Sequence, residues 1–597
     1  MQNNQRNTVW RFAIIFVFIL LGFIAVLGKI FYIQTVERDK WLQLAEKQAP
    51  VLDTVKGSRG NILDCNGNLL ATSMPQYLIV MDASVPALHK KEGELFNKYI
   101  DSLAIDIAAV TGRRTADEYK RIITNAYNKK QVRLVVDTIC INYLQREQLK
   151  QNSLIKKGQF TSGFTFEEYY SRIKPYGILA NRTIGSITGA KGEAEYGLEM
   201  QFDKELKGVS GINKVQRIGN RKEYITVKEP QDGMDIVTTI DANLQDIVET
   251  ALIEKTAEKN AKWGCCILME TQTGYIRAIA NVDRVSEGVY AEKLNHGVTR
   301  IEPGSTFKTI SLMAMMNDGL TNLKDTVTLD GKKWVYFGLE HTDVHGLNEQ
   351  INMRTALAVS SNIAFAKKVT DKYKGSAHKF VKSIDKLGVR DSVYIELPGC
   401  QLPYIFPPKN DTATISSMAY GYSVEVTPMT LVMFYNAIAN NGCMMRPMIV
   451  TALQKDGKNV KTFQPEVLKA SICSPEVLTE VKKALHDVVW DDKYGTASVY
   501  NGVRKAQSDL VSIAGKTGTA QLIIDKQHNK NHHRMTFVGY FPEDNPQYTC
   551  LCMIEDPHRP YDAGMDCGST VRKIAEKTMA YTGCYVYRNG EKKLEKR

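Results

Sequence analysis

The sequence lacks the signatures of several protein classes. No zinc-finger spacing, recognition-helix pattern or glycine-rich phosphate loop accompanies the basic residues, so the formal net charge of +12 does not predict nucleic-acid binding. The eleven cysteines have no framework spacing, which argues against a small disulfide-stapled fold. His341, His345, His532 and His533 lack the spacing of metal ligands, and we expect them to be solvated loop residues. We therefore expect no nucleic-acid partner, no metal and no cofactor.

One long hydrophobic run is present near the N-terminus. It is unbroken from Phe12 to Leu27 and resumes shortly afterwards. A bilayer-spanning helix needs about 20 apolar residues, so we expect a transmembrane helix over residues 12–33. A cleaved secretory signal is the alternative, with Val26 and Gly28 as the small residues before the cut.

The charges that flank this run predict its orientation. Arg6 and Arg11 precede it, and no acidic residue occurs among the first eleven positions. We therefore expect residues 1–11 to form a cytoplasmic tail of a single-pass protein in the cytoplasmic (inner) membrane. The chain after residue 34 then faces outward, on the periplasmic or extracytoplasmic side. A chain of 597 residues is long enough for two or three folded units there.

Residues 34–235 form a mixed region without a catalytic constellation. Leu78–Met81 and Val132–Val136 are strand-like, and Leu95–Val110 is helical in pattern. We interpret this region as a pedestal that sets the height of the following domain above the membrane.

From Ile236 onward, strands at the two ends enclose a helical middle. A helix is expected over Leu244–Lys259, and Thr271–Gly274 has the composition of a hairpin turn between two apolar strands. The later expected strands are Val511–Ala514, Met535–Tyr540 and Tyr548–Ile554. This order predicts an α+β domain over residues 236–597, with a mostly antiparallel sheet sandwiched by helices.

Three short motifs follow one another in this second region. Ser305 and Lys308 form a Ser-x-x-Lys motif behind the chain breaker Pro303-Gly304, and the apolar stretch that follows predicts a buried helix starting at the serine. Ser360–Asn362 and Lys516–Thr519 are the other two motifs. Ser-x-x-Lys alone is a weak signal, since the same spacing recurs elsewhere in the chain. The occurrence of all three motifs in this order predicts a catalytic site.

Together the motifs predict serine acyl transfer. A serine hydroxyl attacks a carbonyl only if a neighbouring group removes its proton as the bond forms. Lys308 is the candidate base, because it lies one helical turn from Ser305. It must be neutral to act, and burial or the nearby positive charge of Lys516 would lower its pKa. Ser360 is suited to pass a proton to the leaving amine.

The remaining motif residues are suited to holding a peptide. The Asn362 amide offers one donor group and one acceptor to a substrate backbone. Gly518 has no side chain, so a substrate can approach the backbone closely. We expect Lys516 and Gly518 to lie on an edge strand beside the helix that Ser305 opens.

The chain resembles a class B penicillin-binding protein, a peptidoglycan D,D-transpeptidase. Besides the three motifs, the resemblance rests on segments spread over nearly the whole length: Arg59–Gly67 with Leu70-Ala71, Gly197–Glu199, Thr239–Asp241 with Gln245, and Gly515–Ala520. Cys65 stands where arginine is usual in this family. Glu302–Ser305, Thr427-Pro428 and Ala439–Gly442 are more similar to the cell-division (septal) branch than to the elongation branch.

The resemblance implies an activity and a set of partners. Ser305 would be acylated by a D-alanyl-D-alanine stem peptide and relieved by an amine of a neighbouring strand, which cross-links peptidoglycan made from a lipid-linked precursor. The backbone N–H groups of Ser305 and Thr519 would form the oxyanion hole, and the Thr517 and Thr519 side chains would bind the substrate carboxylate. β-Lactam antibiotics, a polytopic glycosyltransferase and other division proteins are the further implied partners. The resemblance also implies an elongated, dimerisation-like pedestal over residues 34–235 and a penicillin-binding transpeptidase domain over residues 236–597.

Three alternatives remain open at this level. A β-lactamase or β-lactam sensor shares the acylation machinery but hydrolyses or retains the acyl group. A D,D-carboxypeptidase differs only in the acceptor. A non-enzymatic scaffold of the division machinery is the third, although the presence of all three motifs argues against an idle site.

Overall fold

The computed structural model describes residues 2–42, 51–188, 193–218, 221–391, 395–408, 412–525 and 527–583. The chain divides into two compact units. Unit 1 comprises Met1–Ser58 and Lys207–Gly233, and unit 2 comprises Arg59–Leu206 and Met234–Arg597.

Unit 1 contains an apolar helix and a small antiparallel sheet. Helix α1 (Gln2–Thr35) includes the segment Val9–Thr35, which is long and apolar enough to cross a membrane. Its large apolar side chains are exposed, as those of a lipid-facing helix must be. The sheet has the strand order β1-β8-β9, with β1 at Val51–Val55, β8 at Gly211–Ile218 and β9 at Arg221–Lys228.

A seven-stranded sheet in unit 2 joins three segments that are distant in the sequence. The main path is β22 (Lys458–Thr462), β21 (Val450–Lys455), β10 (Asp235–Thr238), β2 (Ile62–Leu63), β3 (Leu69–Met81) and β4 (Leu134–Val135). Strand β5 (Phe164–Ile173) pairs with β3 along ten residues. Residues from the expected pedestal and from the later region therefore share one sheet.

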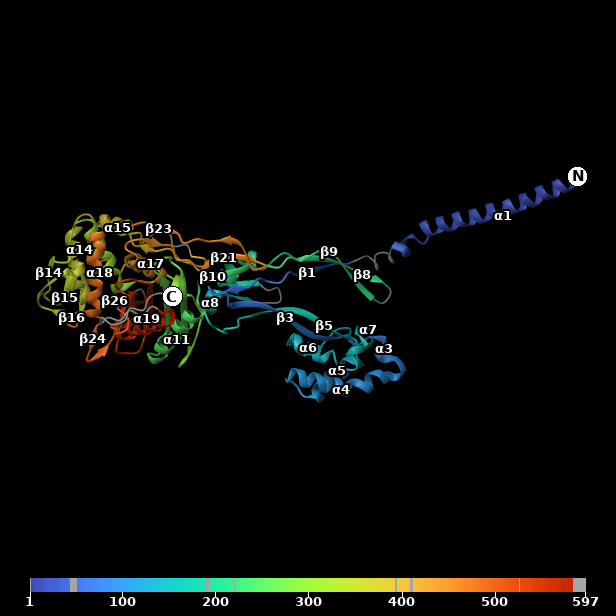
Figure 1. Cartoon of the computed structure of the whole chain (residues 1–597), viewed down its shortest axis with the longest axis horizontal. Helices are drawn as coiled ribbons and strands as arrows, with labels where there is room; N and C mark the ends of the chain where they lie inside the picture. Colours follow the sequence, from blue (N-terminus) through green and yellow to red (C-terminus); the bar gives the residue numbers. More distant parts are fainter. Residues whose placement is uncertain are drawn as a thin grey trace. The chain divides into compact units, whose positions relative to one another are not determined.

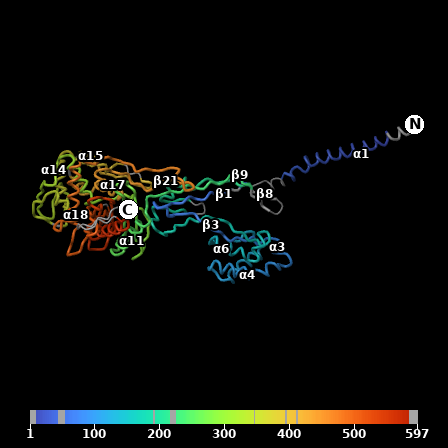
Figure 2. The backbone as a smooth tube through the Cα atoms, in the orientation of Figure 1, coloured from blue at the N-terminus to red at the C-terminus, as the bar shows by residue number. Residues whose placement is uncertain are grey.

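The far end of β3 and β5 carries a helical subdomain, here called the head. It comprises α3 (Pro86–His89), α4 (Glu94–Thr111), α5 (Ala116–Asn128), α6 (Tyr143–Leu149), η2 (Ile155–Lys157) and α7 (Gln159–Ser162), of which Figure 2 shows α3, α4 and α6 clustered together. A capping box between Thr115 and Glu118 starts α5. Buried side chains such as Phe96, Leu103 and Ile123 give the head its own core. The strands and the long helix expected in this region are confirmed.

A six-stranded antiparallel sheet organises the rest of unit 2. Its order is β13 (Val289–Ala291), β12 (Ile276–Ser286), β11 (Trp263–Glu270), β28 (Tyr548–Glu555), β27 (Gln527–Phe541) and β26 (Ala514–Ile524). The turn between β11 and β12 is the expected hairpin at residues 271–274. Strand β26, which contains Lys516 and Gly518, lies at the edge of the sheet, as expected.

Both faces of this sheet are covered by helices. Successive side chains of a strand point to opposite faces, so each strand contributes to two cores. Cys265 and Ile267 of β11 enter one core, whereas Cys266 and Leu268 enter the other. Helices α11 (Ala242–Glu258) and α19 (Ser569–Thr582) pack together on the second face (Figure 1). Helix α17 (Pro428–Ala439), which is buried along its whole length, covers the first face. The expected sandwich of helices around a mostly antiparallel sheet is confirmed.

Helices of the middle region complete the first core. They include α12 (Phe307–Asn317), α13 (Met353–Ala358), α14 (Asn362–Lys372), α15 (Ala377–Lys386), α16 (Thr412–Met418) and α18 (Pro475–Trp490). The hairpin of β15 (Gly331–Tyr336) and β16 (Leu339–Leu347) leads into this set.

Two expectations about local structure are corrected. The strand expected from Val511 begins only at Ala514, because Val511 to Ile513 approach the sheet without joining its ladder. The polar stretch before Arg534 is not a loop: β27 begins at Gln527 and pairs with the end of β26 despite its polar composition. Hairpin pairing to β26 satisfies the backbone groups of this stretch, and the side chains of Gln527, His528, Lys530 and Asn531 are exposed.

A buried carboxylate ties the start of the seven-stranded sheet to its neighbours. Glu199 of α9 (Gly197–Gln201) has a fully buried side chain, and its two oxygens lie 2.7 Å from Arg59 Nε and 2.6 Å from Arg172 Nε. Arg59 directly precedes the β2 region and Arg172 belongs to β5. Glu199 thus contacts two nearly buried cations, and Arg59 has a second carboxylate partner in Asp203, with Nη1 2.5 Å from Oδ1.

We expect Glu199→Ala to destabilise unit 2 strongly. Removing one partner of a buried ion pair typically costs about 3–5 kcal/mol, because the remaining charge stays buried without compensation. Here that charge is Arg172, since Arg59 keeps its contact with Asp203. Scanning calorimetry of the purified chain should show a Tm several degrees lower. The matched control Glu167→Ala removes the exposed pair with Arg133 and should cost less than about 1 kcal/mol. Equal Tm values for the two variants would contradict the role assigned to Glu199.

Candidate active site

Ser305 lies in a tight turn directly before a buried helix. Gly304–Thr306 form one turn of 3-10 helix that continues into α12. Gly304 has φ +56°, and a Cβ at that position would lie 2.9 Å from Cβ of Ala520 on β26. Gly421, at φ +94°, packs against the Gly304 carbonyl in the same way. These two glycines allow the Gly304–Thr306 turn, here called the nucleophile turn after the role expected for Ser305, to contact both β26 and the segment before α17.

Lys308 is buried beside the serine, one turn along α12. Its Nζ lies 3.0 Å from Ser305 Oγ, 3.1 Å from Ser360 Oγ and 2.5 Å from the Ser360 carbonyl oxygen. A neutral amine has two hydrogens to donate and one lone pair. Donation to the two oxygens of Ser360 leaves the lone pair for the hydroxyl proton of Ser305.

Ser360 connects the two motif lysines. It follows α13 with φ +59°, a left-handed conformation that is unfavourable for a residue other than glycine. In this conformation its Oγ lies 2.9 Å from Lys516 Nζ as well as 3.1 Å from Lys308 Nζ. Lys516 lies on β26, where it pairs with Val538 of β27, and also donates to the Thr517 carbonyl at 2.9 Å.

Burial controls the protonation of both lysines. Neither side chain is exposed, whereas Ser305 retains 9% of its surface. Burial lowers the pKa of Lys308 to about 7, and the Asp343 carboxylate opposes this shift. Burial, with a smaller contribution from Lys308, also holds the pKa of Lys516 well below its usual value. Of the two causes expected for Lys308, burial and the charge of Lys516, burial is the main one.

Asp343 is a site residue that the sequence analysis did not identify. It lies on β16, and its carboxylate accepts hydrogen bonds from Ser361 Oγ at 2.5 Å, Asn362 N at 2.6 Å and Ile363 N at 3.2 Å. It thereby caps the N-terminus of α14 and fixes the second motif. Its only signal in the sequence was its position between His341 and His345, in a segment that we expected to be a solvated loop rather than a source of a helix cap.

The Asn362 side chain is positioned by the same strand. Its Nδ2 donates to the Thr342 carbonyl at 2.8 Å, which leaves its second N–H and Oδ1 available to another group.

The third motif presents hydroxyl groups along the edge strand. Thr517 Oγ1 lies 2.6 Å from Thr496 Oγ1, a contact with no signal in the sequence, and Thr519 has an exposed side chain. Gly518 differs from expectation: a Cβ there would lie 2.9 Å from Thr306 Cγ2 and 3.4 Å from the Pro303 carbonyl. The missing side chain thus admits the nucleophile turn itself.

The histidine expectation is wrong for His341. This side chain is buried on β16, with Nδ1 2.9 Å from the Tyr420 hydroxyl and Nε2 3.2 Å from Ser416 Oγ. Burial lowers the pKa of His341, so it is a neutral member of a packed polar cluster. The side chain of His345 lies outside the described residues.

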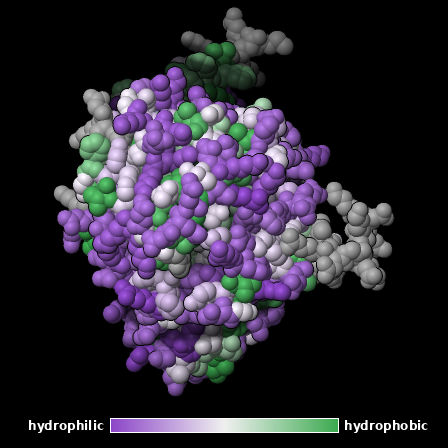
Figure 3. All heavy atoms as spheres, turned by 90° about the vertical axis from the view of Figure 1, so that its left-hand side faces the viewer, coloured by the Kyte–Doolittle hydropathy of each residue, from purple (hydrophilic) through white to green (hydrophobic). Residues whose placement is uncertain are grey.

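Figure 3 shows the face that lies at the left-hand side of Figure 1. This face is mostly hydrophilic, with small scattered apolar groups.

Comparisons with known proteins agree with this geometry. The family described as penicillin binding protein transpeptidase domain matches residues 264–580, which include all three motifs. The family described as penicillin-binding protein dimerisation domain matches residues 54–238. Together they account for most of the chain after α1.

Curated relatives and solved structures cover a similar extent. The chain is 25% identical to stage V sporulation protein D of Bacillus subtilis, over 92% of this chain and 82% of the relative. It is 24% identical to the peptidoglycan D,D-transpeptidase FtsI of Escherichia coli, over 93% and 89%.

The structure of penicillin binding protein 2X from Streptococcus thermophilus matches with a TM-score of 0.73 at 21% identity, over 89% of this chain and 81% of that one. Penicillin binding protein 3 of Mycobacterium tuberculosis complexed with aztreonam matches with a TM-score of 0.62 at 19% identity, over 89% and 98%. The transpeptidase family alone matches more than half of the chain, in the region that places Ser305, Lys308, Ser360 and Lys516 together. The chain therefore belongs to the penicillin-binding protein transpeptidase family, with the domain composition of its class B members.

Proposed function

We propose that the protein is a membrane-anchored serine D,D-transpeptidase that cross-links peptidoglycan stem peptides through an acyl-enzyme on Ser305. The observation that carries this proposal is the contact chain from Ser305 Oγ through Lys308 Nζ and Ser360 Oγ to Lys516 Nζ. Every link is 2.9–3.1 Å long, and the lysine next to the serine has a pKa of about 7. The relatives named peptidoglycan D,D-transpeptidases support the choice of substrate.

Acylation follows from this geometry. Neutral Lys308 accepts the Ser305 proton while Oγ bonds to the carbonyl carbon between the two D-alanines. The carbonyl oxygen gains negative charge, which the backbone N–H groups of Ser305 and Thr519 stabilise. Removing one such donor costs about 2.7–4 kcal/mol in other serine enzymes. Ser360 then passes a proton to the departing nitrogen, and the terminal D-alanine leaves as the ester forms.

The second half-reaction transfers the acyl group. An amine from a neighbouring stem peptide attacks the ester carbonyl, loses a proton through the same lysine and serine, and releases Ser305. Asn362 holds the peptide backbone, while Thr517 and Thr519 bind the terminal carboxylate along β26 and Gly518 keeps the strand close to the nucleophile turn. A β-lactam presents the same carbonyl and carboxylate, so it should acylate Ser305 as well.

One observation favours transfer to an amine over hydrolysis. A hydrolase needs a base that activates water. The Asp343 carboxylate already accepts bonds from Ser361, Asn362 and Ile363 with its two oxygens. It is therefore committed to holding the second motif, which argues against Asp343 as the water-activating base of a β-lactamase. A sensor, which retains the acyl group, needs no such base and would differ by the absence of cross-linked product. A carboxypeptidase would use the same residues with water as acceptor, and a scaffold would need none of this arrangement.

We also propose a location and a cellular role. Helix α1 anchors the chain in the cytoplasmic membrane, residues 1–11 stay in the cytoplasm, and the rest works on the outer side as pedestal (34–235) and transpeptidase domain (236–597). The septal branch is favoured by the Glu302–Ser305 and Ala439–Gly442 segments and by the FtsI relatives. A polytopic glycosyltransferase that makes the glycan strands is the proposed membrane partner.

The nucleophile is tested by Ser305→Ala. We expect the purified wild-type chain to be labelled covalently by a fluorescent penicillin and the variant to be unlabelled, with an unchanged melting profile. Incubation of the wild type with lipid-linked precursor and a cognate polymerase should give cross-linked dimers by mass analysis. Tetrapeptide monomers alone would favour the carboxypeptidase, and labelling at another residue would move the nucleophile.

The base is tested by the pH dependence of acylation. Only the neutral form of Lys308 accepts the serine proton, so the acylation rate should rise about tenfold per pH unit below its pKa of about 7 and level off above it. Stopped-flow absorbance with a chromogenic β-lactam measures this profile. Lys308→Ala should lose acylation without losing its fold. A rate that keeps rising to pH 10 would show that burial does not depress the pKa.

The role of Asp343 is tested by Asp343→Asn. The asparagine oxygen can still accept from the α14 backbone, but the charge that raises the pKa of Lys308 is gone. We expect the midpoint of the pH profile to move to lower pH. The limiting rate should fall by about tenfold to 100-fold, since small displacements of catalytic groups are costly. A midpoint that is unchanged or moves upward would contradict the electrostatic contact.

A further inference from the structure

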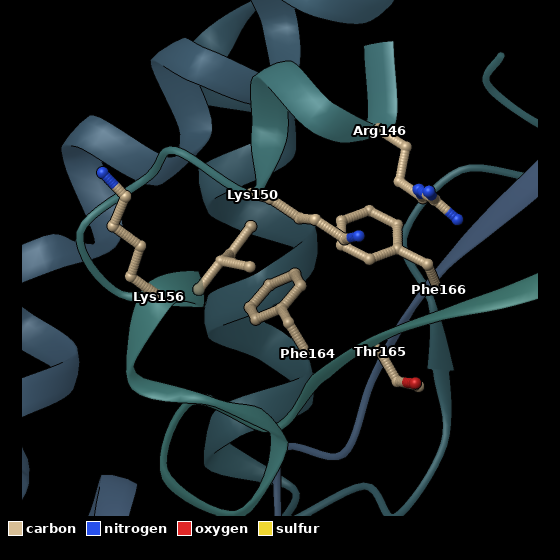
Figure 4. A pocket seen from close by; sticks show the side chains of 7 residues that line it. Arg146, Lys150, Lys156, Phe164, Thr165 and Phe166 are labelled. Carbon is tan, nitrogen blue, oxygen red and sulfur yellow. The ribbon is translucent and has the colours of Figure 1, made fainter. Parts of the chain in front are cut away.

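A cavity in the head lies outside the transpeptidase chemistry. Its volume is about 470 Å³, and Figure 4 shows the side chains that line it. They come from α6 and the residue that follows it, from η2, and from the start of β5: Arg146, Lys150, Ile155, Lys156, Phe164, Thr165 and Phe166. Three of these residues are cationic, the apolar ones include two phenylalanines, and none is acidic.

The positive charge of the cavity is only partly compensated. Residues 146–157 contain four basic residues and one acidic residue, Glu147. Glu147 Oε1 lies 2.7 Å from Arg146 Nη2 and 2.9 Å from Lys150 Nζ, so one carboxylate is shared by two cations. Within the described part of the chain, the Lys156 ammonium has no hydrogen-bond or ion-pair partner. The cavity therefore favours an anion.

The guanidinium group at its edge is held in place before any ligand arrives. Arg146 stacks over the rings of Tyr77 at 3.9 Å and Tyr143 at 4.8 Å. A fixed guanidinium loses little conformational entropy when it binds a carboxylate through paired N–H groups. Figure 4 shows Arg146 on the side of the cavity next to Phe166 and Lys156 on the opposite side.

The cavity opens along an unpaired sheet edge. Among the described strands, β5 pairs only with β3, so its outer edge has backbone N–H and C=O groups without a strand partner. Phe164, Thr165 and Phe166 are consecutive on β5, and their side chains alternate between its two faces. Since all three line the cavity, it extends around that edge. Open edges accept an additional strand from another chain.

We propose that the head binds an extended acidic segment of a partner protein, which adds to the outer edge of β5. A carboxylate of that segment lies between Arg146 and Lys156, and a neighbouring apolar side chain contacts Phe166. The charge of the cavity selects an anion, and the open strand edge selects a peptide over a lipid headgroup or free phosphate. The site does not depend on the proposed transpeptidase reaction.

Defined peptides test this site on the full purified chain. We would use fluorescein-labelled 12-residue peptides of alternating valine and threonine that carry either four glutamates or four lysines. Fluorescence anisotropy should show the acidic peptide binding at least tenfold more tightly than the basic one. Arg146→Ala and Lys156→Glu should each weaken it at least tenfold. Lys129→Glu, at an exposed lysine of the head that does not line the cavity, should leave it unchanged.

Hydrogen–deuterium exchange distinguishes strand addition from loose charge attraction. The bound acidic peptide should protect the amides of residues 164–171 and lose this protection in the Lys156→Glu variant. Absence of binding, equal binding to the variants, or protection elsewhere would overturn the proposal. Binding of inorganic phosphate or phosphatidylglycerol vesicles with the same dependence on Arg146, and without protection of β5, would also overturn it.

Discussion

The burial of two lysine amines around one serine hydroxyl is the constraint on which the transpeptidase region depends. An isolated charged amine in an apolar interior costs several kcal/mol, so the folded state favours neutral lysine there. Lys308 and Lys516 are both fully buried and share the Ser360 hydroxyl. The same burial that stabilises the neutral form makes Lys308 a base near neutral pH. Burial of the amine therefore explains both the neutral state of Lys308 in the fold and its pKa near 7.

This arrangement requires three separate segments to approach within van der Waals contact. The nucleophile turn, the turn between α13 and α14, and strand β26 come from different parts of the sequence. Gly304 and Gly421 remove the side chains that would keep these backbones apart, and Gly518 admits Thr306. The left-handed Ser360 and the Asp343 cap then fix the middle segment. The six-stranded sheet, packed on both faces, supplies the rigid support.

The head and the transpeptidase region differ in the groups that they present. The head has its own core, a cationic cavity and an open strand edge, but it has none of the three catalytic motifs. The transpeptidase region also has an open edge, at β26, where Lys516 and Thr519 lie. In each region a strand edge, β5 or β26, thus lies next to cationic or hydroxyl groups, an arrangement suited to binding an extended peptide.

The residues alone were sufficient for the apolar N-terminal helix and the antiparallel hairpin at 271–274, and the ordered set of motifs was sufficient for the edge position of Lys516 and for the convergence of the three motifs. Apolar run length, period-two alternation and helical spacing are local properties, so they can be read from short windows. The start of β26, the strand character of Gln527–Arg534 and the buried state of His341 could not be, because ladder pairing and burial depend on residues far along the chain. The contacts of Asp343 and Thr496 with the motif residues could not be predicted either, because they too join residues that are distant in the sequence. Only the tertiary structure decided that an aspartate from a hairpin would cap α14, and that burial rather than a second charge would set the pKa of Lys308, since both depend on which distant groups exclude water.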